Sequence, residues 1–168
     1  KGFSGADLKR TLASFKVVSK ITAIPVRNPM QVQYFGAAPF LFGQGQAMKF
    51  SAAPCTAIKQ EPFTNATPDS PDKDYLHDAL KQTVQGKQDV CYDFKIQTRS
   101  IDTDALNIED ATTTWPDELN RYVSVARITV KVPQSPGSSD ALKHCEQLAF
   151  TPWHSLAVHR PLGGINRL

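Results

Sequence analysis

Three segments of the chain place apolar residues at the spacing of one helix face. The first predicts a helix that begins near Ser4, ends before Pro25 and turns its apolar stripe to the core. The second predicts a short helix after Pro71 that Gly86 ends, and the third a helix with Asp140 as N-cap. The apolar faces are Leu8, Leu12, Phe15, Val18 and Ile21 in the first, Leu76, Leu80 and Val84 in the second, and Leu142, Cys145, Leu148 and Ala149 in the third.

Four other segments have the composition of strands. Residues 30–35 (MQVQYF) and 47–54 (AMKFSAAP) lie on either side of the turn signal FGQGQ and predict a hairpin. Residues 89–98 alternate cleanly, with one apolar and one polar face, and residues 122–132 predict a fourth strand. The order helix, two strands, helix, two strands, helix, tail predicts an α+β fold with an antiparallel sheet. Residues 56–73 are expected to form a long loop.

Composition and charge narrow the class of protein. The 168 residues fit one domain, and a net charge of +3 with scattered Lys and Arg gives no indication of nucleic-acid binding. No apolar run is long enough to span a membrane. Three widely spaced cysteines (Cys55, Cys91 and Cys145) show no zinc spacing and predict buried, reduced thiols, which favours an intracellular compartment. The chain opens on Lys1 without a Met, so we expect a processed or partial chain.

The candidate catalytic groups are few. Solvated side chains are the simpler interpretation for His77 and His144, and hydrogen-bonding structural roles for His154 and His159, which have no carboxylate nearby to complete a metal site. No metal site is predicted. Acidic residues at 109 and 110 are adjacent, whereas a catalytic pair needs carboxylates held apart at a set distance. Seven aromatic residues of the strand region fit either the core or the lining of a flat pocket: Tyr34, Phe35, Phe40, Phe42, Phe50, Tyr92 and Phe94.

Four motifs occur in a fixed order: IEDATTTWPDE (108–118), VARITV (125–130), EQLAFTPWH (146–154) and HRPLGGINR (159–167). Together with the upstream pattern in residues 28–55, they resemble the catalase superfamily, and more closely its smaller catalase-related haem proteins. The resemblance covers nearly all of the chain. It implies that residues 1–168 are part of one catalase-like, haem-binding antiparallel β-barrel domain, with about four strands of the second barrel half and flanking helices in this chain.

The resemblance also implies haem b as cofactor. It places the distal histidine before Lys1 and the proximal tyrosine after Leu168, so no catalytic residue is expected in this chain, which looks truncated at both ends. Phe150 and Ile165 are expected at the haem edge and Phe40 in the pocket lining. Arg167 is expected to form a hydrogen bond on the propionate side.

Two functions from different classes follow from the resemblance. The first is haem-dependent breakdown of hydrogen peroxide or organic hydroperoxides, an oxidoreductase activity of catalase or peroxidase type that belongs to the parent protein. The alternative is a non-catalytic catalase-like structural or accessory subunit without haem. The expected partners are a peroxide substrate and either the remainder of the barrel or another chain that takes the place of that remainder. A homo-oligomer is an open alternative, whereas nucleic acid and a membrane span are not expected.

Overall fold

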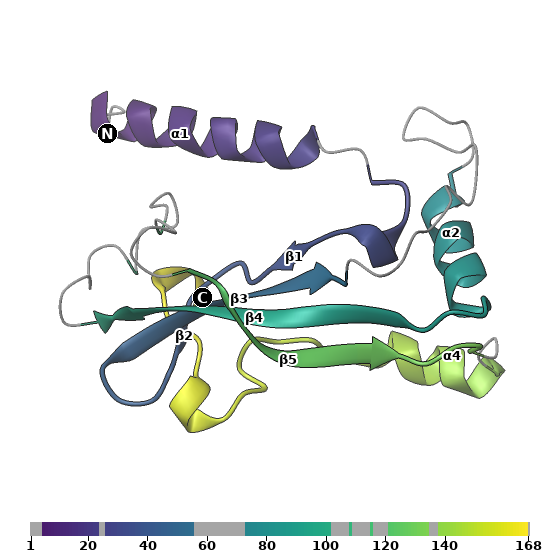
Figure 1. The fold of residues 1–168 in the computed structure, drawn as a ribbon. Helices are drawn as coiled ribbons and strands as arrows, with labels where there is room; N and C mark the ends of the chain where they lie inside the picture. The colour runs from purple at the N-terminus through teal and green to yellow at the C-terminus, as the bar shows by residue number, and fades with distance from the viewer. Residues whose placement is uncertain are drawn as a thin grey trace.

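A computed structural model describes residues 5–23, 26–55, 73–101, 108, 115, 121–134 and 138–167 (Figure 1). Its helices are α1 (Gly5–Thr22), α2 (Tyr75–Val84) and α4 (Ser139–Glu146), with the single turns η1 (Pro29–Gln31), η2 (Ala157–His159) and η3 (Gly164–Arg167). Its strands are β1 (Tyr34–Phe35), β2 (Phe40–Leu41), β3 (Gln46–Pro54), β4 (Val90–Ser100) and β5 (Val123–Val130). The predicted loop of residues 56–73 and the acidic pair at 109 and 110 fall almost wholly outside the described residues.

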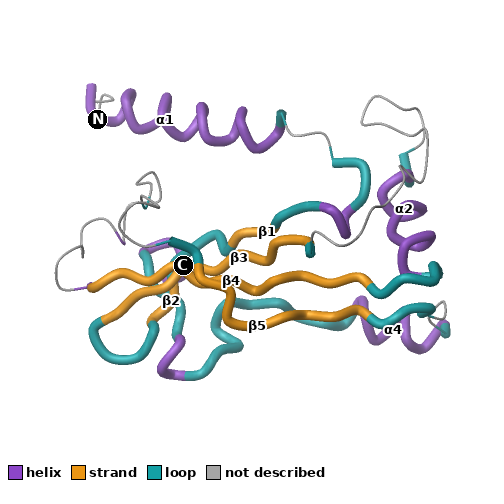
Figure 2. The backbone as a smooth tube through the Cα atoms, in the orientation of Figure 1, coloured by secondary structure: helices purple, strands orange, loops and turns teal. Residues whose placement is uncertain are grey.

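The strands form one antiparallel sheet in the order β1-β3-β4-β5, and β2 also pairs with β3 (Figure 2). β1 and β2 follow one another along the same edge of β3, where Tyr34 faces Ala52 and Phe40 faces Met48. β3 and β4 are the central pair, in register from Gln46 opposite Ser100 to Pro54 opposite Tyr92. The α+β prediction is confirmed. Among the described residues the sheet has five strands rather than the four predicted, because the segment before β3 contributes two short strands, β1 and β2.

The strand predicted over residues 30–35 is wrong at its start. Pro29 occupies the first turn of η1, and the Asn28 side chain accepts a hydrogen bond of 2.9 Å from the Met30 backbone N–H. A capping Asn followed by Pro favours a helical turn, so pairing begins only at Tyr34. The hairpin joins β2 to β3 instead, and its turn uses positive φ angles at Gly43 and Gly45.

β5 departs from the strict alternation that the sequence predicts. Ala126 faces Phe94 and Ser124 faces Lys95, so a bulge at Val125 places Ser124 and Ala126 on opposite faces of the sheet. β5 is also an edge of the described sheet, and its side chains are almost all exposed. Neither face of this strand is covered by the described residues.

The helices agree with the predictions in position more than in burial. α2 is confirmed and buries Ala79 and Thr83. The N-cap of α4 is Ser138, whose side chain accepts from the Ala141 N–H, so the prediction of Asp140 is wrong by two residues. Leu142 (61% exposed) and Cys145 were expected to point inward but lie on a helix without buried residues, which ends at Glu146. Leu148 and Ala149 follow it in exposed chain without regular secondary structure.

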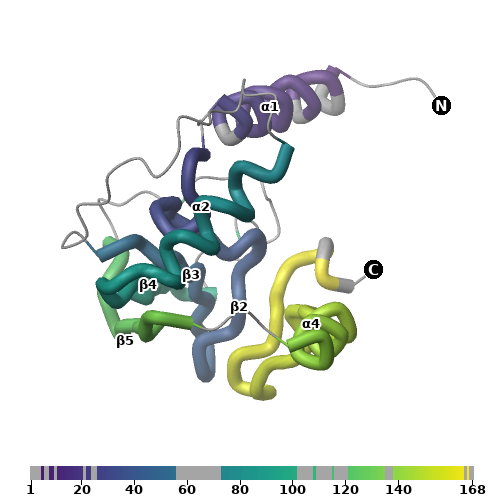
Figure 3. The backbone as a smooth tube through the Cα atoms, turned by 90° about the vertical axis from the view of Figure 1, so that its right-hand side faces the viewer, coloured from purple at the N-terminus to yellow at the C-terminus, as the bar shows by residue number. Residues whose placement is uncertain are grey.

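α1 lies apart from the sheet in Figures 1 and 3. Its expected core stripe is exposed: Phe15 is 72% accessible, and Leu8, Leu12 and Val18 are each more than half accessible. The side chains of Asp7 and Ile21, like Ser4, lie outside the described residues. The prediction of a core face for α1 is therefore wrong within the described part of the chain, because no described element covers the stripe.

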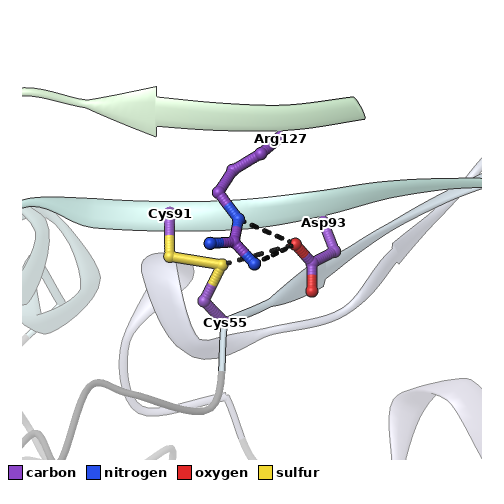
Figure 4. Close-up of a disulfide and its surroundings, with 4 residues drawn as sticks. All are labelled: Cys55, Cys91, Asp93 and Arg127. Atoms are coloured by element: carbon purple, nitrogen blue, oxygen red, sulfur yellow. Dashed lines mark hydrogen bonds and ion pairs between the residues drawn. A yellow bond between two sulfur atoms is a disulfide. The ribbon is translucent and has the colours of Figure 1, made fainter. Parts of the chain in front are cut away.

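The cysteines also differ from the prediction. Cys55 and Cys91 form a disulfide between the end of β3 and the start of β4 (Figure 4), and Cys145 is a free, exposed thiol. The two bonded cysteines are 36 residues apart in sequence and neighbours only through the β3–β4 pairing. A buried cluster on the same sheet contains Ala47, Ile108 and Trp115, with Ile101 and Leu162 against it.

Candidate functional site

A cavity of about 450 Å³ lies between the sheet and the C-terminal tail. One wall comes from β2, β3 and the turn before β2, and the other from the chain that follows α4. Figure 3 shows this tail running alongside β2. The lining is mostly apolar and includes Ala37, Ala38, Phe40, Phe50, Ala149, Phe150 and Pro152, with Thr151, His154 and Asn166 as its polar members. A concave, mainly apolar site with few polar groups is typical of a small-molecule or cofactor pocket.

Backbone hydrogen bonds attach the tail to β2. The Leu41 N–H donates to the Arg160 carbonyl at 2.8 Å, and the Leu162 N–H donates to the Pro39 carbonyl at 2.8 Å. His159 adds a ring stacked on Phe42, with its Nδ1 at 3.2 Å from the Leu41 carbonyl oxygen. These contacts fix the tail wall against the sheet wall. They also confirm a hydrogen-bonding structural role for His159.

Phe40 and Phe50 line the cavity from the sheet side, and Phe94 packs against Phe50 beneath it. The ring centroids of Phe40 and Phe50 are 5.4 Å apart, and those of Phe50 and Phe94 are 5.7 Å apart. Since Phe50 lies between two rings, its position is set from both sides. The open question of core or pocket is thus answered for Phe40 and Phe50, which line the cavity, whereas Tyr34 and Phe35 are exposed.

The polar members lie on the tail side. Asn166 donates its side-chain amide to the Leu162 carbonyl, and its own carbonyl accepts a 2.9 Å bond from Trp153 Nε1. The backbone N–H of His154 donates to the Thr151 carbonyl, so a tight turn carries the His154 side chain. Among the lining residues, His154 is the one that carries an imidazole ring. Predicted solvated positions are confirmed for His77 and His144, which are exposed on helices.

The structure brings together two of the four residues expected to contact the cofactor. Phe40 and Phe150 line the same cavity from opposite walls, although they are 110 positions apart. Phe150 is 90% exposed, so its ring is available to a ligand. The side chains of Ile165 and Arg167 lie outside the described residues, although their backbone belongs to η3.

Sequence reasoning missed a second group of residues, on the other face of the sheet. Trp115 is 5% exposed, with Lys49 Nζ at 4.5 Å and the Arg99 guanidinium carbon at 5.5 Å from its ring centroid. Burial, and then the charge of Arg99, lowers the pKa of Lys49. Lys49 lies opposite Gln97, two residues before Arg99 on β4. Because side chains alternate along a strand, the register of β3 on β4 puts Lys49 and Arg99 on the same face of the sheet.

The described residues suit contact with the porphyrin ring of a haem better than ligation of its iron. The apolar residues that line the cavity suit a porphyrin, but a tyrosinate ligand needs an ionised phenol that is not already bonded. Tyr34 and Tyr92 both donate to the Pro29 carbonyl, at 2.7 and 3.1 Å, and Tyr75 donates to the Val26 carbonyl at 3.0 Å. Burial, and then the nearby Tyr34, raises the pKa of Tyr92 to about 12. The three phenols therefore serve the structure of the sheet and of η1.

Among the described residues, no three His, Cys, Asp or Glu side chains gather as metal ligands do. A helix of the length and apolarity needed to cross a membrane is likewise absent from the described residues.

Comparison with solved structures identifies the architecture. A fungal catalase matches 81% of the chain with a TM-score of 0.61 and 15% sequence identity. A bacterial catalase matches 86% of the chain with a TM-score of 0.63 and 18% identity. The fold is catalase-like. The chain spans 28% and 29% of the length of these two catalases, so the catalase-like sheet described above corresponds to a part of each. Neither the family models nor the curated proteins compared with the sequence match it.

Proposed function

We propose that this chain is part of a haem-dependent oxidoreductase that breaks down hydrogen peroxide or organic hydroperoxides. The observation that carries the proposal is the cavity, because it places Phe40, Phe50 and Phe150 around one apolar space within a catalase-like fold. Bound haem would supply the redox chemistry that cleaves the peroxide O–O bond. The axial ligand and the distal base are proposed to come from residues other than those described.

The roles of the chain's own residues follow from the lining. Phe40 and Phe50 would contact the porphyrin ring through dispersion and exclude water from it. Phe150 would cover the ring from the tail side. His154 and Asn166 would offer polar side chains to the ligand from the tail side of the cavity. Ile165 and Arg167 stay proposed contacts of the haem edge and propionate side.

Haemin titration tests the proposal. We expect the protein to bind haemin with a sharpened Soret band, and Ala149→Trp to weaken binding about tenfold or more because the indole would fill the cavity mouth. Ala141→Trp is the matched control, since Ala141 is exposed on α4 and outside the lining. Equal haemin affinity in the wild type and Ala149→Trp would remove this cavity from the proposal.

A second candidate is a catalase-like structural or accessory subunit without haem. It is favoured by the hydrogen bonds of Tyr34, Tyr75 and Tyr92, which leave these phenols without a ligand role. It predicts that the complete protein purifies without a Soret band and does not acquire one with haemin. Peroxide consumption by the complete protein, measured by oxygen release, separates the two candidates.

A further inference from the structure

We infer that Cys55 and Cys91 form a peroxide-reactive thiol pair, which closes to the observed disulfide when a hydroperoxide oxidises it. The inference rests on the proposed function only for the choice of oxidant. The two cysteines lie at the C-terminal end of β3, where the chain leaves the sheet, and away from the cavity.

The β3–β4 ladder holds the two cysteines at bonding distance in either redox state. They lie directly opposite, one position beyond the pair Pro54 and Tyr92, and the Cys55 N–H donates to the Cys91 carbonyl at 3.0 Å. Their Cα atoms are 5.4 Å apart. This distance is both the ordinary spacing of a hydrogen-bonded antiparallel pair and a normal spacing for a disulfide. Formation and reduction of the bond therefore require no movement of the strands.

The surroundings assign different roles to the two sulfurs. Cys55 is 8% exposed and its Sγ lies 3.7 Å from Asp93 Oδ1. In the reduced pair the Cys55 thiol would donate to this carboxylate. Arg127 pairs with the same oxygen at 3.0 Å, and Figure 4 shows both charged groups on the Cys55 side of the disulfide. Cys91 is more exposed than Cys55. Peroxide would thus reach Cys91 first, and Cys55 would resolve the product.

The reaction balances with one hydroperoxide. Cys91 first releases its thiol proton to solvent. The resulting thiolate attacks a peroxide oxygen, the S–O bond forms as the O–O bond breaks, and the leaving oxygen takes up one proton from solvent to become water or alcohol. The Cys55 thiol then transfers its proton to Asp93 and attacks the Cys91 sulfur. The S–S bond forms, and the hydroxyl group leaves as water with the proton that Asp93 returns. Both thiols are oxidised and the hydroperoxide is reduced; a small-molecule dithiol restores the pair through exchange at the more exposed sulfur.

The test follows each cysteine by thiol labelling and peptide mass spectrometry. The protein is reduced with dithiothreitol under native conditions, desalted and mixed with equimolar hydrogen peroxide in the absence of haemin. We expect Cys55 and Cys91 to lose their thiols together, about tenfold faster than Cys145, whose exposed free thiol is the internal control. In Cys55→Ser, Cys91 should gain one oxygen and react with dimedone, whereas in Cys91→Ser the rate at Cys55 should fall to that of Cys145.

Asp93→Asn checks the assigned proton acceptor. It should slow closure of the disulfide while the first step at Cys91, measured in the Cys55→Ser background, keeps its rate. Two results would overturn the inference: dithiothreitol reduces the disulfide only after denaturation, or the two thiols react no faster than Cys145. Either result would mean that the disulfide is a structural cross-link. The thiol measurements use no haemin. If they contradict the thiol-pair inference, the haemin titration still tests the proposed function independently.

Discussion

The side-chain amide of Asn28 donates a 2.8 Å hydrogen bond to the hydroxyl of Thr83, and both side chains are buried. Asn28 lies just before η1 and Thr83 on α2, so the bond joins segments 55 residues apart. The Thr83 hydroxyl in turn donates a 2.8 Å hydrogen bond to the Ala79 carbonyl. This pair is a buried polar link between α2 and the start of the sheet, in addition to the bond from Tyr75 to the Val26 carbonyl.

Thr83→Val tests that link with almost no change in volume. The valine cannot accept from Asn28, and a buried donor left without its partner costs about 1–3 kcal/mol of unfolding free energy. Thr22→Val is the control, because the exposed Thr22 hydroxyl bonds only to carbonyls of its own helix. Urea unfolding monitored by circular dichroism should give a clearly lower midpoint for Thr83→Val than for Thr22→Val. Equal midpoints would contradict the role of the pair.

Gly36→Ala should disturb the sheet side of the cavity. A Cβ at this position would lie 2.9 Å from Cε1 and Cζ of Phe50, whose ring is held between Phe40 and Phe94. We expect a loss of about 1–3 kcal/mol from overpacking and weaker haemin binding. Gly5→Ala, where the added Cβ meets nothing within 4 Å, is the matched control. An unchanged melting temperature for Gly36→Ala would show that the ring shifts freely.

The raised pKa of Tyr92 predicts a loss of stability in alkali. The phenol has a pKa of about 12 in the folded chain and an ordinary value of 10 when unfolded, because burial and then Tyr34 disfavour the phenolate. As pH rises, the unfolded chain releases this proton first, so the stabilisation is complete below pH 10 and is lost between about pH 10 and 12. Denaturant unfolding at several pH values should show this loss, and Tyr92→Phe should make the curve flatter in that window. A parallel pH profile for the variant would contradict the assignment.

The open edge at β5 predicts self-association. Val123 and Val125 are exposed on the edge strand of the described sheet, and exposed apolar residues on an edge strand favour pairing with another chain. The bulge at Val125 interrupts this edge at one residue and leaves Val123 and residues 126–130 in ladder geometry. We expect Val125→Lys to shift the 168-residue chain toward monomer in sedimentation velocity. Leu142→Lys adds the same charge at an exposed site on α4 and should leave association unchanged. A wild-type chain that is monomeric at high concentration would refute the prediction.

Local patterns were sufficient for much of the sheet. Alternation predicted β4, since one face of it holds Val90 and Tyr92, both buried. The glycines at 43 and 45 predicted the turn, because positive φ is cheap only for glycine. Tail motifs predicted the catalase-like fold that comparison with solved catalases confirms. Of the expected site, Phe40 and Phe150 line one cavity, and Ile165 and Arg167 stay predictions.

Periodicity by itself determined which residues share a face in α1, α4 and β4, because the geometry of a helix or strand is set by neighbouring residues. In β5 it failed at the bulge, which places Ser124 and Ala126 on opposite faces. It could not determine whether a face is covered, so the stripe of α1 and the inward side of α4 were wrongly placed in a core. Only tertiary structure decided that Cys55 bonds to Cys91, that Trp115 lies beside Lys49, and that the tail forms a wall of the cavity. These contacts join distant parts of the chain, and their partners are selected by the register of β3 on β4 and by the path of the tail along β2, which no local pattern contains.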